Sequence, residues 1–168
     1  MTNSFINPIL SKETLESHII RSEIFKAVSE ACSSFYGRVL DSGCGSMPYK
    51  QFILSNSKVT DYVGLDIASG LNYEDVKPDV LWDGSVMPFE DESFDVVIST
   101  EVLEHVPNPD SYLREVKRVL KPGGMFFFTV PFLMSLHEVP NDYYRYTPYA
   151  LEIILKRNGF STIIIKPM

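Results

Sequence analysis

Short apolar runs alternate with amphipathic, helix-like segments along the whole chain. The strand-like runs cover residues 39–41, 61–67, 79–83, 94–100, 125–130 and 162–166. Helix-like periodicity covers residues 12–35 and about 48–55, and it follows two N-cap–proline pairs, at 108–109 and 147–148. The run at 95–99 is apolar on both faces, as in a central parallel strand. This alternation predicts an α/β fold: a Rossmann-like, doubly wound, mostly parallel sheet with helices on both faces.

Glycine and polar residues gather immediately after the predicted strands. They lie in segments 41–47, 100–105 and 131–146, and at Asp66 and Asp83. Because right-handed crossovers bring the carboxyl ends of parallel strands to one edge, we expect these segments to share one rim of the sheet, where ligands of such folds bind.

The first predicted strand runs into the turn Asp41-Ser42-Gly43-Cys44-Gly45, and Asp66 closes the second strand 21 residues after Gly45. Glycines allow a sharp turn and a close approach of a ligand to main-chain N–H groups. A carboxylate at the end of the second strand can accept hydrogen bonds from a ribose diol. The spacing therefore predicts a nucleoside-containing cofactor and leaves its identity open.

The composition narrows the class of protein. The chain has 168 residues, 45% of them hydrophobic and 22% charged, with a net charge of −7. This predicts one domain, with a helical segment at 1–36 and a Rossmann-like core at 37–168. Without a basic cluster, a long apolar run or a signal peptide, we expect a cytoplasmic protein that binds neither nucleic acid nor membrane. Two cysteines provide neither a disulfide framework nor metal-ligand spacing, so no metal is expected.

Four motifs in order resemble the class I S-adenosylmethionine-dependent methyltransferases of the small-molecule, domain 11-like type. These motifs are Leu40-Asp41-Ser42-Gly43-Cys44-Gly45, the segment from Asp83-Gly84-Ser85 to Val97, Glu101-Val102-Leu103-Glu104-His105-Val106, and Arg118-Val119-Leu120-Lys121-Pro122-Gly123-Gly124. The resemblance covers roughly residues 38–132. It implies an enzyme that transfers a methyl group by in-line displacement to a small-molecule acceptor, such as a hydroxyl or amine of a sugar or secondary metabolite, and releases S-adenosylhomocysteine.

The resemblance also implies where the cofactor lies. Gly43 and Gly45 would border its methionine part, Asp66 its ribose, and Asp83 its adenine amino group. Ile67 would sandwich the adenine together with Val86 or Met87. The full set of residues implied at the cofactor is Asp41, Gly43, Cys44, Gly45, Asp66, Ile67, Asp83, Gly84, Ser85 and Thr100.

Two departures from the family pattern stand out. Met47 occupies the place of the usual third glycine, which predicts a wider or differently routed turn. The family's sheet has seven strands, whereas this chain ends at the sixth predicted one, so we expect a longer natural protein or a homodimer contact around residues 161–168.

The loop at 131–146 is the predicted acceptor site, because long loops in compact domains are usually functional or disordered, and its aromatic content argues against disorder. Catalytic candidates are His137, Glu101 and His105; Glu104 is interpreted as a surface or helix-end charge. Tyr143, Tyr144 and Arg145 are candidates for acceptor binding. The alternative is that Asp142 and Arg145 pair to fold the loop.

Two rival functions remain at this point. An NAD-dependent oxidoreductase would carry a third glycine where Pro48 stands, which argues against it. A non-catalytic S-adenosylmethionine-binding module would retain the fold without transferring a methyl group.

Overall fold

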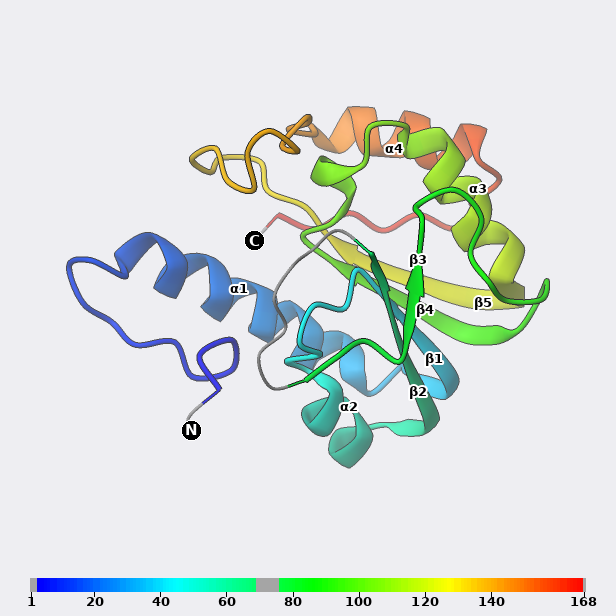
Figure 1. Ribbon diagram of the computed structural model, residues 1–168, viewed down its shortest axis with the longest axis horizontal. Coiled ribbons are helices and arrows are strands. Elements are labelled where there is room, and N and C mark those ends of the chain that lie inside the picture. The colour runs from blue at the N-terminus through cyan, green and yellow to red at the C-terminus, as the bar shows by residue number, and fades with distance from the viewer. Residues whose placement is uncertain (1–2, 69–75, 168) are drawn as a thin grey trace.

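The computed structural model describes residues 3–68 and 76–167 and contains a parallel five-stranded sheet (Figure 1). The strands are β1 (Tyr36–Ser42), β2 (Lys58–Ile67), β3 (Val80–Trp82), β4 (Phe94–Thr100) and β5 (Leu120–Thr129). Their order is β3-β2-β1-β4-β5, and every neighbouring pair is parallel. The Rossmann-like fold class is thus confirmed, together with five of the six predicted strands.

The strand order reverses between β1 and β4, which are neighbours in the sheet but not in the chain. In open α/β sheets this switch point marks the ligand crevice at the carboxyl ends of the strands. The glycine turn follows β1 there, and Thr100 and Glu101 stand at the end of β4. The sheet therefore brings the predicted polar segments to one edge.

Helices cover both faces of the sheet. These are α1 (Leu15–Cys32), α2 (Lys50–Asn56), α3 (Pro109–Val119) and α4 (Pro148–Arg157), with a short 3₁₀ helix, η1 (Leu103–His105). In Figure 1, α3 and α4 lie together on one face, and α1 and α2 lie on the other. The Asn108 side chain accepts from the Ser111 N–H, and Pro109 follows as the first helical residue, so α3 begins where the sequence predicts.

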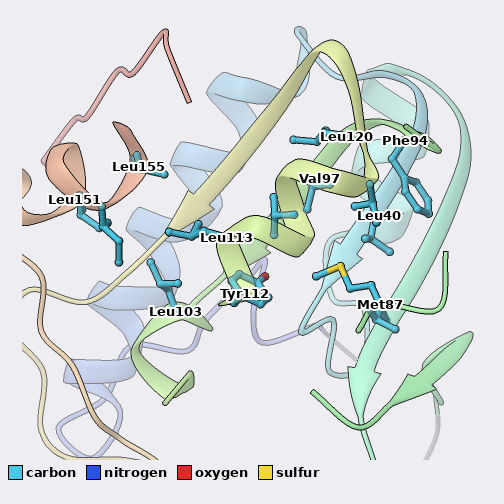
Figure 2. Close-up of a cluster of buried hydrophobic side chains, with 14 of the residues drawn as sticks. Leu40, Met87, Phe94, Val97, Leu103, Tyr112, Leu113, Leu120, Leu151 and Leu155 are labelled. Carbon is cyan, nitrogen blue, oxygen red and sulfur yellow. The ribbon is translucent and has the colours of Figure 1, made fainter. Parts of the chain in front are cut away.

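Alternate residues of the central strands supply two hydrophobic cores. Val97 points to the core under α3 and α4, shown in Figure 2 with Leu113 and Leu151. Its neighbour Val96 belongs to the core under α1 and α2. Both valines are fully buried, which explains why this strand is apolar on both faces.

The entry into β5 is irregular. Leu120 pairs with Phe94, but the next paired residue, Met125, lies opposite Val96. The four residues 121–124 therefore stand opposite the single residue Asp95, which makes a bulge in β5, and Gly123 has a left-handed φ of 76°. The strand predicted from residue 125 thus begins at Leu120 instead, with this irregular segment inside its bounds.

The sixth predicted strand is wrong. Residues 162–166 form no strand in the structure, although Ile163 and Ile165 pack against the core under α3 and α4 and Ile164 is exposed. Burial of every second isoleucine thus explains the apolar run, although the segment does not pair with β5 as a strand. The expected homodimer contact around residues 161–168 was based on an exposed edge strand, and the structure has no strand at residues 161–167, the part of this segment that it describes. The contact itself stays a prediction.

Within the described residues, no helix is both long and apolar enough to cross a membrane.

Candidate functional site

The glycine turn after β1 is tied to the end of β2 by main-chain hydrogen bonds. The N–H groups of Gly43 and Cys44 both donate to the Leu65 carbonyl, at 2.8 and 3.1 Å. Gly43 has a φ of 76°, and a Cβ there would lie 2.4 Å from a methyl of Val102. Position 43 therefore requires glycine for both conformation and space.

Asp66 joins the turn to β2 through its carboxylate. Its Oδ2 accepts from the Gly45 N–H at 2.7 Å, and its Oδ1 accepts from the Ile67 N–H at 2.7 Å. A carboxylate offers about four lone-pair sites, so each oxygen retains capacity for another donor. Among the described residues, no atom lies within 4 Å of where a Cβ on Gly45 would stand, so this part of the chain leaves space beside the turn. This arrangement fits a ligand with a diol.

Met47 occupies the place of the family's third glycine and has a φ of 53°, in the left-handed region that normally favours glycine. Its N–H donates to the Cys44 carbonyl at 2.7 Å, and its buried sulfur lies where a Cβ on Gly64 would have to be. The turn accommodates methionine by adopting this conformation and packing the side chain against β2.

The segment after β3 offers a polar cap and an apolar face. Asp83 is exposed, and its Oδ1 accepts from the Ser85 N–H at 2.9 Å and from the Ser85 hydroxyl. Ile67 and Val86 are 43% and 65% exposed, whereas Met87 is buried in the core. Of the two residues expected to face Ile67 across an adenine, only Val86 is therefore accessible.

Asp41 and Cys44 are buried beside the turn. The Tyr62 hydroxyl donates to Asp41 Oδ2 at 2.6 Å, and burial raises the pKa of Asp41 to about 7. Burial also raises the pKa of the Cys44 thiol well above its usual value, which makes it unreactive. Both side chains therefore pack beneath the glycine turn, in the interior of the protein.

Glu101 directly follows Thr100, the last residue of β4. It lies near His137 and Arg145 of the loop at 131–146, which we call the acceptor loop. Its φ is 54°, and its N–H donates to the Thr129 carbonyl at 3.1 Å. Burial raises the pKa of its carboxyl, and its buried Oε1 has no hydrogen-bond partner in the part of the chain that the structure describes. Its left-handed backbone matches the strained conformations that often occur at functional sites.

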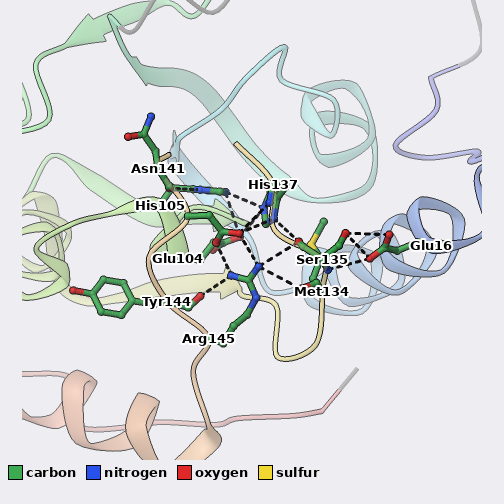
Figure 3. Close-up of polar contacts among 10 residues, drawn as sticks. Glu16, Glu104, His105, Met134, Ser135, His137, Asn141, Tyr144 and Arg145 are labelled. Atoms are coloured by element: carbon green, nitrogen blue, oxygen red, sulfur yellow. Dashed lines mark hydrogen bonds and ion pairs between the residues drawn. The ribbon is translucent and has the colours of Figure 1, made fainter. Parts of the chain in front are cut away.

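The predicted loop at 131–146 folds over η1 (Figure 3). The N–H groups of Tyr143 and Tyr144 donate to the Glu104 carbonyl at 2.9 and 3.2 Å. His105 Nδ1 lies 2.7 Å from the Asn141 carbonyl, and its Nε2 lies 3.0 Å from Nε2 of His137. The structure therefore places His137 beside His105 and the main chain of Tyr143 and Tyr144 against η1, whereas the Tyr144 hydroxyl donates to the Pro107 carbonyl.

Glu104 is fully buried, so the interpretation as a surface or helix-end charge is wrong. Among the described residues, neither carboxylate oxygen of Glu104 has a hydrogen-bond partner, and burial, with Glu101 nearby, raises the pKa of Glu104 to about 8. The signal available in the sequence was the apolar context, since Glu104 lies between Leu103 and Val106. What buries the side chain is the distant loop.

Asp142 and Arg145 form the ion pair that was the structural alternative for this loop. Arg145 donates from both terminal nitrogens to the two Asp142 oxygens, at 2.5 and 2.8 Å. It also reaches the carbonyls of Tyr144 and Ser135, and it holds the pKa of the Asp142 carboxyl well below its usual range. The pair closes the loop on itself, and Asp142 in turn accepts from the His137 N–H at 3.0 Å.

Comparison with known proteins gives consistent results. The model of the family described as "Methyltransferase domain" matches residues 40–128. A fatty-acid O-methyltransferase of Mycolicibacterium smegmatis is 34% identical over 99 residues, which cover 55% of this chain and 36% of that protein. A ubiquinone biosynthesis O-methyltransferase of Paraburkholderia phymatum is 35% identical over 105 residues, covering 55% and 43%. The chain thus matches less than half the length of these two curated relatives.

Solved structures share the fold. A putative methyltransferase of Bacillus halodurans superposes with a TM-score of 0.64 at 22% identity, over 82% of this chain and 68% of that one. A phosphoethanolamine N-methyltransferase 2 of Haemonchus contortus, solved with S-adenosyl-L-methionine, gives 0.62 at 20% identity, over 93% and 44%. With the family match over residues 40–128 and the glycine turn tied to Asp66, the chain belongs to the S-adenosylmethionine-dependent methyltransferase family of the class I fold.

Proposed function

We propose that the chain binds S-adenosylmethionine at the carboxyl edge of the sheet, with the ribose hydroxyls donating to Asp66. The observation that carries this is the Asp66 carboxylate, which is fixed by two backbone N–H donors and lies against Gly45, where an added Cβ would meet no atom of the described residues within 4 Å. The exposed side chains of Ile67 and Val86 provide apolar surface for the adenine, and Asp83 offers an acceptor for its amino group. A phosphoethanolamine N-methyltransferase of the same fold, solved with the cofactor, supports this.

When bound, S-adenosylmethionine supplies an electrophilic methyl group for in-line displacement. The chain needs no covalent intermediate; its residues hold the two reactants in line, and such positioning is worth roughly 7–11 kcal/mol. The glycine turn and Asp66 fix the cofactor side of this arrangement. The loop at 131–146, held by the Asp142–Arg145 pair, fixes the acceptor side.

The proposed acceptor is a small molecule with a hydroxyl or amine, bound between the end of β4 and the loop. Phe132, Leu133 and Leu136 are strongly exposed on the loop, which favours an acceptor with an apolar part. The relatives named as fatty-acid and ubiquinone O-methyltransferases support this class of acceptor. Tyr143 and Tyr144 are proposed to contact the acceptor. Glu101, His105 and His137 are proposed to assist the loss of the acceptor's proton during methyl transfer.

Calorimetry and a transfer assay test the proposal. The chain should release heat on titration with S-adenosylmethionine and with S-adenosylhomocysteine, but not with NADH. It should then pass a labelled methyl group to members of a panel of fatty acids, phenols, sugars and amines. Tyr144→Ala should raise the KM of the acceptor more than that of the cofactor. Absence of heat with both cofactor forms would overturn the proposal, and heat without transfer to any acceptor would favour a binding module.

A further inference from the structure

Three side chains converge where the acceptor loop covers η1. Glu104 and His105 come from η1, and His137 comes from the loop (Figure 3). Nε2 of His105 lies 3.0 Å from Nε2 of His137, and these atoms lie 3.8 and 3.9 Å from Oε1 of Glu104. We call these three residues the Glu–His–His triad.

No described residue donates a hydrogen bond to the carboxylate of Glu104. It is fully buried, and both oxygens are unpartnered among the described residues. A buried carboxylate without a donor is costly, and the great majority of buried polar atoms have a partner. The imidazole nitrogens at 3.8 and 3.9 Å are too distant for hydrogen bonds. Oε1 therefore lacks a ligand on the side that faces the histidines.

The Nδ1 contacts of the two rings favour one tautomer. His105 Nδ1 lies 2.7 Å from the Asn141 carbonyl, and His137 Nδ1 lies 3.3 Å from the Ser135 carbonyl. Carbonyl oxygens only accept, so a neutral ring that donates to its carbonyl carries its proton on Nδ1. The two Nε2 lone pairs then face each other at 3.0 Å, and a cation between them removes the repulsion.

The separations fit a metal ion. A circle through three atoms that lie 3.0, 3.8 and 3.9 Å apart has a radius of about 2.1 Å, within the roughly 2.0–2.2 Å of zinc–nitrogen and zinc–oxygen bonds. We infer that the Glu–His–His triad is a binding site for a divalent transition-metal ion. The ion would be held by Nε2 of His105, Nε2 of His137 and a carboxylate oxygen of Glu104.

The surroundings of the triad support this assignment. Each histidine turns its other nitrogen to a backbone carbonyl, and His137 Nδ1 also lies 3.4 Å from Asp142, as is usual for metal-bound histidine. Glu101 and Asp142 are negatively charged neighbours of Glu104, and Arg145 is a positively charged one. With Glu104 ionised, these four groups leave an excess of two negative charges. Two imidazoles and one carboxylate favour Zn²⁺, Fe²⁺, Co²⁺ or Ni²⁺ over Mg²⁺ and Ca²⁺.

Three protein ligands leave an open position, as in catalytic rather than structural zinc sites. The side chains of His105 and His137 are 20% and 24% exposed, so this position is accessible from solvent. An oxygen or nitrogen of the acceptor bound there would lose its proton more easily. This role rests on the proposed function, whereas the existence of the site does not.

Metal binding by the purified protein tests the site. After treatment with EDTA and removal of the chelator, titration with ZnCl₂ should show one tight equivalent per chain. CoCl₂ should give the visible absorption bands of Co²⁺ bound by nitrogen and oxygen. His105→Ala, His137→Ala and Glu104→Gln should each weaken Zn²⁺ binding by at least about 10–100-fold, the loss that even an outer-shell change can cause.

His18 provides the matched control, because it is the remaining histidine of the chain and lies in α1 against the Pro8 carbonyl. His18→Ala should bind Zn²⁺ as the wild type does. S-adenosylhomocysteine calorimetry on the metal-free protein separates the two proposals, since it reports cofactor binding alone, and the same titration shows that each variant is folded. No stoichiometric Zn²⁺ or Co²⁺ binding by the wild type, or equal binding by Glu104→Gln, would overturn the metal site and mean that a shared proton links the two rings.

Discussion

Asp66 and Gly45 are joined by a 2.7 Å hydrogen bond from the Gly45 N–H to the Asp66 carboxylate. The bond sets the glycine turn against the end of β2, so one side chain both shapes the turn and presents the acceptor oxygens proposed for the ribose. Local geometry and cofactor affinity therefore depend on the same carboxylate.

Asp66→Asn should weaken the binding of S-adenosylhomocysteine by roughly 10–100-fold, because hydrogen bonds to a charged acceptor contribute about 1.5–3 kcal/mol. The carboxylate accepts from the N–H groups of Gly45 and Ile67, whereas the amide of asparagine would place its NH₂ donor against one of these two N–H groups. Isothermal titration calorimetry measures the change. Asp61→Asn is the matched control, because Asp61 lies in the same strand, is 55% exposed and pairs with Arg38. Equal affinities in the two variants would remove Asp66 from the cofactor site.

Asp41 should make the stability of the protein depend on pH. Burial raises its pKa to about 7 in the folded state, against about 3.9 in an unfolded chain. The protonated form is therefore favoured by folding, so its contribution is complete below about pH 4 and is lost as the pH rises to 7. Three pKa units correspond to up to about 4 kcal/mol.

Asp41→Asn should remove this contribution to the pH dependence, because an amide does not ionise but can still accept from Tyr62. Urea unfolding at pH 5 and pH 8 should show a smaller loss of unfolding free energy in the variant than in the wild type. Asp91→Asn removes one exposed charge as a control and should follow the wild-type profile. A variant profile parallel to that of the wild type would contradict the buried, protonated state of Asp41.

Sequence patterns predicted the sheet where a strand is defined by its own residues. The run at 94–100 is apolar on both faces and is bounded by polar residues, and it forms β4 with those bounds. The run at 162–166 has a similar composition but forms no strand beside the edge strand β5, because composition alone does not decide whether a segment pairs with a neighbouring strand. Its isoleucines satisfy their burial by packing alone.

The cofactor side of the site was predictable because its geometry is local. The 21-residue spacing from Gly45 to Asp66 spans one strand–helix–strand unit, and that unit brings the two residues into contact. The environment of Glu104 was not predictable, since its burial depends on residues 137–144, more than thirty positions along the chain. No local pattern reports a contact of that kind.

Arg145 should control the order of the acceptor loop. It binds both oxygens of Asp142 and three backbone carbonyls of the loop, and the Asp142 side chain is 1% exposed. Arg145→Lys keeps the charge but loses the bidentate geometry. Amide hydrogen exchange at residues 135–146 should therefore become faster, while the exchange of the sheet stays unchanged. Arg114→Ala, which removes an exposed arginine of α3 bonded to Ser111, should leave loop exchange as in the wild type. Unchanged exchange in Arg145→Lys would mean that the loop is held by its other contacts.

Tyr112 should stabilise the junction between α3 and the two central strands. Its hydroxyl lies 3.0 Å from Oγ of Ser42 in β1 and 2.9 Å from Oγ of Ser99 in β4, and all three side chains are buried. Tyr112→Phe keeps the ring but leaves the serine hydroxyls short of a partner, at a cost of roughly 1–3 kcal/mol.

Urea unfolding measures this cost, with Tyr149→Phe as the control because Tyr149 is 79% exposed on α4. The control should change the free energy of unfolding by less than about 0.5 kcal/mol. The serines stand at or near the carboxyl ends of β1 and β4, on either side of the strand-order switch point, so the same substitution should also weaken S-adenosylhomocysteine binding slightly. Equal stabilities of Tyr112→Phe and Tyr149→Phe would show that the ring alone, through its packing in the core, holds α3 on the sheet.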